Sequence, residues 1–308
     1  MQWTRRKIVA GAALLAGCGR APAEAQEPKM PTAPLLTRPI PATGEILPIV
    51  GLGTWQAFDI APGDADWTQA REALAAFAKA GGKVVDSSPM YGKAEAAIGA
   101  LAVELKLRQN LFLASKVWTQ GRAAGQAQIA DSHRKLQAPT LDLMQVHNLL
   151  DLDTHMATLR DAKAAGTIRY IGVTHYDESA YDALEAAMRR HPLDFIQINA
   201  SVAERTSETR ILPLAAERGM AVLINRPFAG GDLFSRVRRL PLPAWAPEIG
   251  AQSWAQVLLK YVLANPAVTC AIPGTRNPRY VLDNLGAATG PLPDAAQRRR
   301  IVEAVATA

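Results

Sequence analysis

Short apolar runs alternate along the chain with longer stretches in which apolar residues recur every three or four positions. The short runs are typical of buried parallel strands, and the longer stretches are typical of amphipathic helices. Trp67, Leu74 and Phe77 share one helical face, and Gly81-Gly82 ends that helix. The pattern predicts strands near 49–53, 83–86, 111–116, 141–146, 168–173, 194–199, 220–225 and 268–272. It predicts further helices near 94–106, 122–136, 154–165, 178–190, 207–218, 252–264 and 294–305.

This alternation predicts an α/β protein whose eight strands close into a parallel (β/α)8 barrel, the TIM-barrel architecture. Residues 40–48 are expected to form an N-terminal hairpin, and 294–305 an extra C-terminal helix. The competing fold is an open, doubly wound sheet. The dinucleotide-binding motif of that fold has three glycines between the first strand and the helix that follows it. Here only Gly51 and Gly53 stand at the end of the first strand, so the third glycine is missing. A length of 308 residues with 49% hydrophobic content fits one barrel domain over 42–308.

An export signal is predicted over residues 1–25. Arg5-Arg6 precede an apolar run that is too short to span a bilayer, and this arrangement resembles a twin-arginine signal. Residues 15–18 resemble a lipobox, in which Cys18 would carry a lipid anchor, while 23–25 offer a competing cleavage site. We therefore expect a periplasmic protein, lipid-anchored or released in soluble form, with an uncleaved cytoplasmic N-terminus as the alternative. Prolines recur over 26–41, which predicts an extended tether.

Charge and cysteine usage exclude several classes of function. The net charge of +6 falls to +3 without residues 1–17, which hold three basic residues and no acid. That charge is too small to indicate a nucleic-acid partner, and no basic strip is interleaved with aromatic residues. Only Cys18 and Cys270 are present, so no disulfide is expected in the mature chain. Cys270 is expected to be a buried thiol in the core. No spacing of ligand residues indicates a metal site.

Four chemically different side chains follow three successive predicted strands. Asp86, Lys116 and His147 stand at strand ends, and Tyr91 lies on the loop after the first of them. Each alone is explained by a structural role such as a helix cap or a core histidine. Together they lie where an α/β barrel collects its chemistry, at the carboxyl ends of its strands. The sequence therefore predicts one catalytic site formed by all four.

These residues resemble the motif of the aldo/keto reductase family, with Tyr91-Gly92 and Glu95 at the family's spacing from Asp86. The likeness runs from about residue 49 to 285. It implies that Tyr91 is the general acid, that Lys116 lowers the pKa of Tyr91, and that Asp86 holds Lys116. It also implies that His147 orients the carbonyl of a small-molecule aldehyde, ketone or alcohol.

The resemblance also implies a nicotinamide nucleotide, with NADP favoured over NAD. Its adenosine phosphate end would meet Gly274, Thr275, Asn284 and either Arg276 or Arg279, because arginine and free helix N–H groups suit phosphate. The alternative is a plain turn with surface arginines. One departure is Tyr280, which stands near where many members carry an arginine.

The nicotinamide end departs further from the family pattern. Thr174-His175 replace a common Ser-Asn pair, whereas Gln197 matches the glutamine that contacts the carboxamide. Asn225 or Arg226 falls where many members stack a tyrosine on the nicotinamide ring. We expect that stacking to be lost or replaced by an arginine plane.

Trp55, Trp118 and Phe228 are the candidate walls of an apolar substrate pocket, which is expected to be open and to accept several aldehydes. The protein is read as a monomeric, exported, NADP(H)-dependent carbonyl reductase that also works toward alcohol oxidation. A low-turnover nucleotide-binding or redox-sensing module on the same fold remains an alternative. A sugar- or osmolyte-binding lipoprotein without a cofactor is a third interpretation.

Overall fold

The computed structural model describes residues 30–31 and 33–307. The predicted signal segment 1–25, with Cys18, lies outside the described residues. Among the described residues, no helix is long and apolar enough to cross a membrane.

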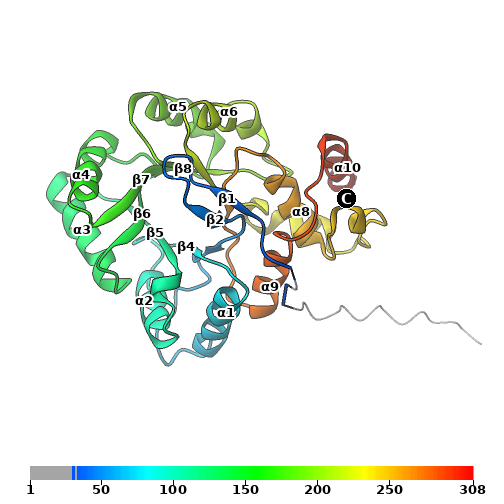
Figure 1. Cartoon of the computed structure of the whole chain (residues 1–308), viewed down its shortest axis with the longest axis horizontal. Helices are drawn as coiled ribbons and strands as arrows, with labels where there is room; N and C mark the ends of the chain where they lie inside the picture. Colours follow the sequence, from blue (N-terminus) through cyan, green and yellow to red (C-terminus); the bar gives the residue numbers. More distant parts are fainter. Residues whose placement is uncertain (1–29, 32, 308) are drawn as a thin grey trace, which may run out of the picture.

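Eight parallel strands follow one another around a barrel in chain order (Figure 1). Two isolated parallel bridges, Val50 to Ala271 and Gly53 to Gly274, join the first strand to the last. The predicted (β/α)8 barrel is therefore confirmed. The strands are β3 (Leu52–Gly53), β4 (Val84–Asp86), β5 (Phe112–Val117), β6 (Leu141–His147), β7 (Ile168–Thr174), β8 (Phe195–Asn199), β9 (Ala221–Asn225) and β10 (Cys270–Ala271).

Helices surround the barrel on its outside (Figure 1). Apolar residues of strands and helices form one large cluster between the two layers. The helix α7 was not predicted, because six residues are too few for a helical period to show. The helices are α1 (Trp67–Lys79), α2 (Ala94–Glu104), α3 (Arg122–Lys135), α4 (Leu152–Ala164), α5 (Tyr181–Arg190), α6 (Ile211–Glu217), α7 (Asp232–Val237), α8 (Trp254–Leu263), α9 (Pro278–Gly286) and α10 (Ala295–Ala306).

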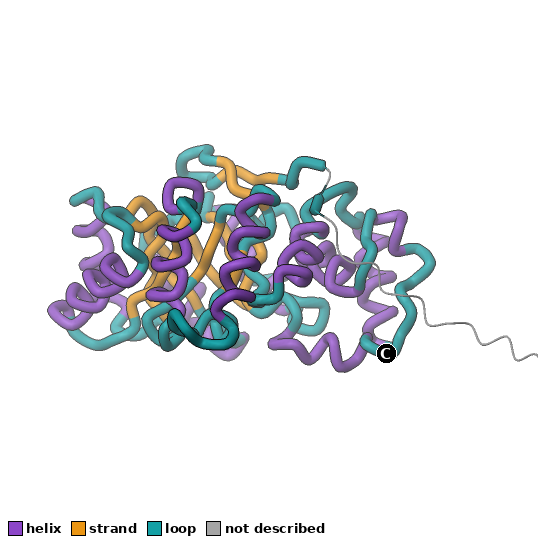
Figure 2. The backbone as a smooth tube through the Cα atoms, turned by 90° about the horizontal axis from the view of Figure 1, so that it is seen from below, coloured by secondary structure: helices purple, strands orange, loops and turns teal. Residues whose placement is uncertain are grey.

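The N-terminal hairpin pairs β1 (Thr37–Pro39) with β2 (Ile46–Pro48) and lies across the amino-terminal end of the barrel (Figure 2). Ile40 and Leu47 are buried in the same cluster as the barrel-interior residues Phe112, Tyr170 and Phe195. The hairpin thus closes that end, and only the opposite end is left for a site.

The hairpin begins earlier than the sequence predicted, because β1 lies inside the range 26–41 assigned to a tether. The Arg38 guanidinium donates to the carbonyls of Leu263 at 2.6 Å and Asn265 at 2.8 Å, at the end of α8. The composition of this segment is proline-rich, but its arginine and apolar residues are held by the barrel.

Candidate active site

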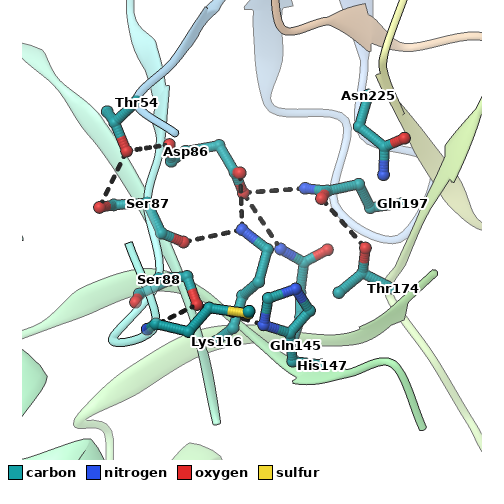
Figure 3. Close-up of polar contacts among 12 residues, drawn as sticks. Thr54, Asp86, Ser87, Ser88, Lys116, Gln145, His147, Thr174, Gln197 and Asn225 are labelled. Atoms are coloured by element: carbon teal, nitrogen blue, oxygen red, sulfur yellow. Dashed lines mark hydrogen bonds and ion pairs between the residues drawn. The ribbon is translucent and has the colours of Figure 1, made fainter. Parts of the chain in front are cut away.

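The carboxyl ends of β4, β5 and β6 bring Asp86, Lys116 and His147 together (Figure 3). Asp86 and His147 are the last residues of β4 and β6, and Lys116 is next to last in β5. Because parallel neighbours end at the same edge, three short strands that are distant in sequence place their last side chains within one cluster.

Asp86 is the centre of this cluster. The Lys116 Nζ donates to its Oδ2 at 2.6 Å and to the Ser87 carbonyl at 2.7 Å. The amide of Gln197 donates to the Asp86 Oδ1 at 2.8 Å. Burial lowers the pKa of Lys116, but the Asp86 carboxylate and the Tyr91 hydroxyl more than offset this, so the pKa of Lys116 is raised. Lys116 is therefore a buried ammonium that is charged at neutral pH.

Tyr91 lies beside this ammonium, with the Lys116 Nζ 4.8 Å from its ring centroid. Burial raises the pKa of Tyr91, the Lys116 charge lowers it, and the Asp86 carboxylate raises it again. The net pKa is raised. Lys116 lowers the pKa of Tyr91 as expected, but desolvation is the larger effect and decides the net direction. The phenol is protonated at neutral pH and ready to donate.

His147 faces Tyr91 across the site. Its ring centroid lies 6.0 Å from that of Tyr91 and 6.4 Å from that of Trp118, and its Nδ1 is 3.2 Å from the Ser88 Oγ. Burial, the Lys116 charge and His175 lower the pKa of His147 to about 2. When Ser88 donates to Nδ1, the proton of the neutral imidazole sits on Nε2. His147 can then give a hydrogen bond without adding a charge.

These side chains open onto a cavity of about 540 Å³. Ten of the residues predicted for the site line it: Trp55, Asp86, Tyr91, His147, Thr174, Gln197, Asn225, Arg226, Phe228 and Gly274. Six others do not: Lys116, which is buried against Asp86, and Trp118, His175, Thr275, Arg276 and Asn284.

The loop after β7 differs from its predicted arrangement. The ring of His175 stacks on that of Tyr176 at 5.5 Å, and Tyr176, not His175, lines the cavity. Burial lowers the pKa of His175. Thr174 Oγ1 donates to the Gln197 Oε1 at 3.0 Å, so both ends of the Gln197 amide are engaged within the protein.

The predicted adenosine end lies between β10 and α9. A Cβ on Gly274 would come 3.3 Å from the Gly53 carbonyl, so this glycine lets the first and last strands approach. The Arg276 Nη2 pairs with the Asp66 Oδ2 at 2.5 Å, beside the start of α1. Thr275 Oγ1 accepts from the Asn277 backbone at 3.1 Å. Asn284 is buried on α9.

Sequence reasoning missed several polar residues of the site. Gln145 is fully buried, and its amide lies 3.4 Å from the Asp86 Oδ1. Thr54 Oγ1 donates to the Asp86 carbonyl and to the Ser87 Oγ, each at 3.0 Å. The signal for Gln145 was present, because alternate residues of a strand share a face and Gln145 precedes His147 by two.

The cavity fits a ligand that forms hydrogen bonds. Asn225 Oδ1 and Arg226 Nε are buried without a partner among the described residues. Beside them the wall is backbone at Gly230, Gly231 and Gly274, which leaves room for a close approach. A dinucleotide, with amide, hydroxyl and phosphate groups, suits such a wall. No group of three or more His, Cys, Asp or Glu residues in the described part of the chain could hold a metal ion.

Comparison with known proteins gives one consistent result. Residues 49–304 match the aldo/keto reductase family. Aldo-keto reductase YhdN of Bacillus subtilis is 26% identical over 268 residues, which are 77% of this chain and 78% of that protein. The NADH-specific methylglyoxal reductase of Escherichia coli is 25% identical over 239 residues, 68% of this chain and 72% of that protein. A crystal structure of an aldo-keto reductase from Klebsiella pneumoniae in complex with NADPH has a TM-score of 0.72 and 27% identity, covering 85% of this chain and 92% of that one.

Proposed function

This chain belongs to the aldo/keto reductase family, and from that premise we propose that it reduces small aldehydes and ketones to alcohols, reversibly, with NADP(H). One observation carries the proposal. Tyr91 and His147 line the same cavity, and the buried Lys116–Asp86 pair lies directly behind Tyr91.

The side chains divide the chemistry among them. When bound, the nicotinamide nucleotide supplies or accepts the hydride. Tyr91 gives its proton to the oxygen of the carbonyl as negative charge develops there. Lys116 stabilises the phenolate that remains, and Asp86 fixes Lys116. His147, as a neutral donor, orients the carbonyl oxygen beside Tyr91.

The nucleotide would lie along the wall from Gln197 and Asn225 to Gly274, with Thr275, Arg276 and Asn284 toward its adenosine end. We propose NADP rather than NAD, supported by the NADPH complex of the Klebsiella protein, although one relative is named NADH-specific. The Asp66 carboxylate already forms an ion pair with Arg276, so a 2′-phosphate would have to displace that carboxylate. Titration of the purified protein with NADPH and NADH, followed by tryptophan fluorescence, tests the preference.

Turnover on a panel of simple aldehydes, compared between wild type and Tyr91→Phe, tests the reaction. Removing the proton donor is expected to lower kcat about 100-fold or more. A Tyr91→Phe protein that turns over as fast as wild type would show that the reductase assignment is wrong.

A low-turnover nucleotide-binding or redox-sensing module is the second candidate. It is favoured by Gln197, whose amide is held by Asp86 and Thr174 and so must be released before it can contact a nucleotide. Tight nucleotide binding without turnover on any aldehyde would select this candidate.

A further inference from the structure

The imidazole of His147 has one polar neighbour within the described part of the protein. That neighbour is Ser88, whose Oγ lies 3.2 Å from the His147 Nδ1 (Figure 3). The ring lines the cavity, and its Nε2 forms no hydrogen bond with any described residue. His147 is neutral, with a pKa of about 2, so its single ring proton sits on one of two nitrogens. Which nitrogen holds it decides whether His147 can donate toward the cavity.

The Ser88 hydroxyl decides between the two nitrogens. Ser88 is fully buried, and its Oγ accepts from the backbone N–H of Met90 at 3.4 Å. The proton of this hydroxyl needs an acceptor of its own, because a buried O–H that donates to nothing costs free energy. Among the described residues, the acceptor within reach is the His147 Nδ1. Ser88 therefore donates to Nδ1, and the ring proton is left on Nε2.

The opposite arrangement of protons would disturb the site. With its proton on Nδ1, His147 would donate to Ser88 and leave the Ser88 hydroxyl without an acceptor. The Nε2 would then present a lone pair to the cavity, where a carbonyl oxygen also only accepts. The same lone pair would attract the hydroxyl proton of Tyr91, which lies across the site with its ring centroid 6.0 Å from that of His147. The substrate would lose one donor and compete with His147 for the other.

We propose that Ser88 is a positioning residue, whose hydroxyl keeps the ring proton of His147 on Nε2 and so makes His147 a donor toward the cavity. Ser88 acts only through His147, because Ser88 itself does not line the cavity. Its effect on the reaction rests on the proposed function, whereas the position of the proton does not.

NMR spectra of protein labelled with ¹⁵N in its five histidines show which ring nitrogens hold a proton, and His147→Gln identifies the signals of His147. In wild type, the proton is expected on Nε2 in about nine molecules of ten or more. In Ser88→Ala, the ratio of the Nε2–H form to the Nδ1–H form should fall about five- to tenfold, the scale of one hydrogen bond. Ser88→Thr keeps the hydroxyl and should keep the wild-type ratio.

Ser132→Ala is the matched control. Ser132 is a fully buried serine of α3 that does not line the cavity, so its loss removes a buried hydroxyl without touching the site. The His147 signals should be the same in this variant as in wild type. A wild-type ring with its proton on Nδ1, or an equal ratio in wild type and Ser88→Ala, would overturn the proposal.

Kinetics show whether Ser88 acts through His147. Ser88→Ala should lower kcat for aldehyde reduction about two- to fivefold, because fewer molecules hold a donor at Nε2, and should leave NADPH affinity unchanged. The same change made in His147→Gln should cost nothing further, since glutamine has no ring proton to place. Equal losses of kcat in the two backgrounds would overturn the role through His147.

The two kinds of measurement separate this proposal from the proposed function. If wild type reduces no aldehyde, the reductase assignment fails, but the NMR spectra still decide where the proton of His147 lies. If wild type turns over and its ring proton is on Nδ1, the reductase assignment stands and the role of Ser88 is wrong.

Discussion

At the level of single residues, the site depends on opposing effects on Tyr91. Burial raises the pKa of its hydroxyl, and Lys116 works against that increase. For a general acid, a raised pKa keeps the proton on the group over a wider pH range. It also makes the proton harder to give, so stabilisation of the phenolate by Lys116 matters more for the rate.

The pH dependence of kcat follows from these directions. Tyr91 should lose its proton only above its ordinary value of 10.0, and His147, with a pKa of about 2, should stay neutral throughout. The rate of aldehyde reduction is therefore expected to be flat from about pH 5 to about pH 9 and to fall only at higher pH. A kcat profile with an acidic limb that disappears in His147→Gln would contradict this.

Lys116→Met should lower the stability of the fold as well as the rate of the reaction. The variant leaves the Asp86 carboxylate buried and without its cation, which typically costs about 3–5 kcal/mol of unfolding free energy. The double variant Lys116→Met, Asp86→Leu removes both charges and should recover most of that loss. Urea unfolding measures the unfolding free energy of wild type and of the two variants. Equal values for the single and the double variant would show that an unpaired Asp86 carboxylate costs little stability.

The residues of the candidate site were partly readable from sequence. Asp86, Lys116 and His147 end apolar runs, and that pattern alone places them together. Gln145 was missed because it lies inside a strand. Tyr176 was missed because the family motif draws attention to Thr174 and His175, which come just before it. The net direction of the Tyr91 pKa could not be predicted, because it depends on how deeply the loop buries the phenol.

At the level of elements, the hairpin is held by polar contacts beneath the barrel. Glu45 Oε2 accepts from the Tyr170 hydroxyl at 2.7 Å and pairs with Arg169, which also pairs with Asp142 at 2.6 Å. Thr43 Oγ1 lies 2.7 Å from the same hydroxyl. β6 and β7 are therefore tied to the turn of the hairpin.

Tyr170→Phe tests this tie. The change keeps the ring in the aromatic cluster with Phe112 and Phe195 but removes two hydrogen bonds, so unfolding free energy should fall by about 1–2 kcal/mol. Tyr176→Phe, at an exposed tyrosine, is the control and should change stability by less than about 0.5 kcal/mol. Equal chemical denaturation midpoints for the two variants would show that the hairpin contacts contribute little.

Elements with a clear hydrophobic period were predicted well, and the others were not. The strand predicted near 111–116 is β5 at Phe112–Val117. In contrast, β1 was hidden in a proline-rich segment, because its stability comes from contacts with the far end of the chain rather than from its own pattern. Short elements of this kind depend on tertiary contacts that a local window does not contain.

At the level of the whole molecule, the two ends of the barrel have different tasks. The hairpin and the aromatic cluster fill the amino-terminal end, whereas the carboxyl end keeps a cavity with buried charge. Such a cavity is maintained only if the rest of the barrel supplies stability. Substitutions at Tyr170 should therefore change stability with little effect on kcat, and those at Tyr91 the reverse.

Export is the prediction that concerns the entire chain. We propose that Arg5 and Arg6 direct the protein through the twin-arginine route, which carries folded proteins and would let a nucleotide bound in the barrel cross with it. Replacing both arginines by lysine is expected to leave the protein in the cytoplasm, because that route reads the arginine pair and not merely its charge. Cell fractionation with immunoblotting measures this, and Cys18→Ala separates lipid anchoring from soluble release. A twin-lysine variant found in the periplasm in wild-type amounts would rule the route out.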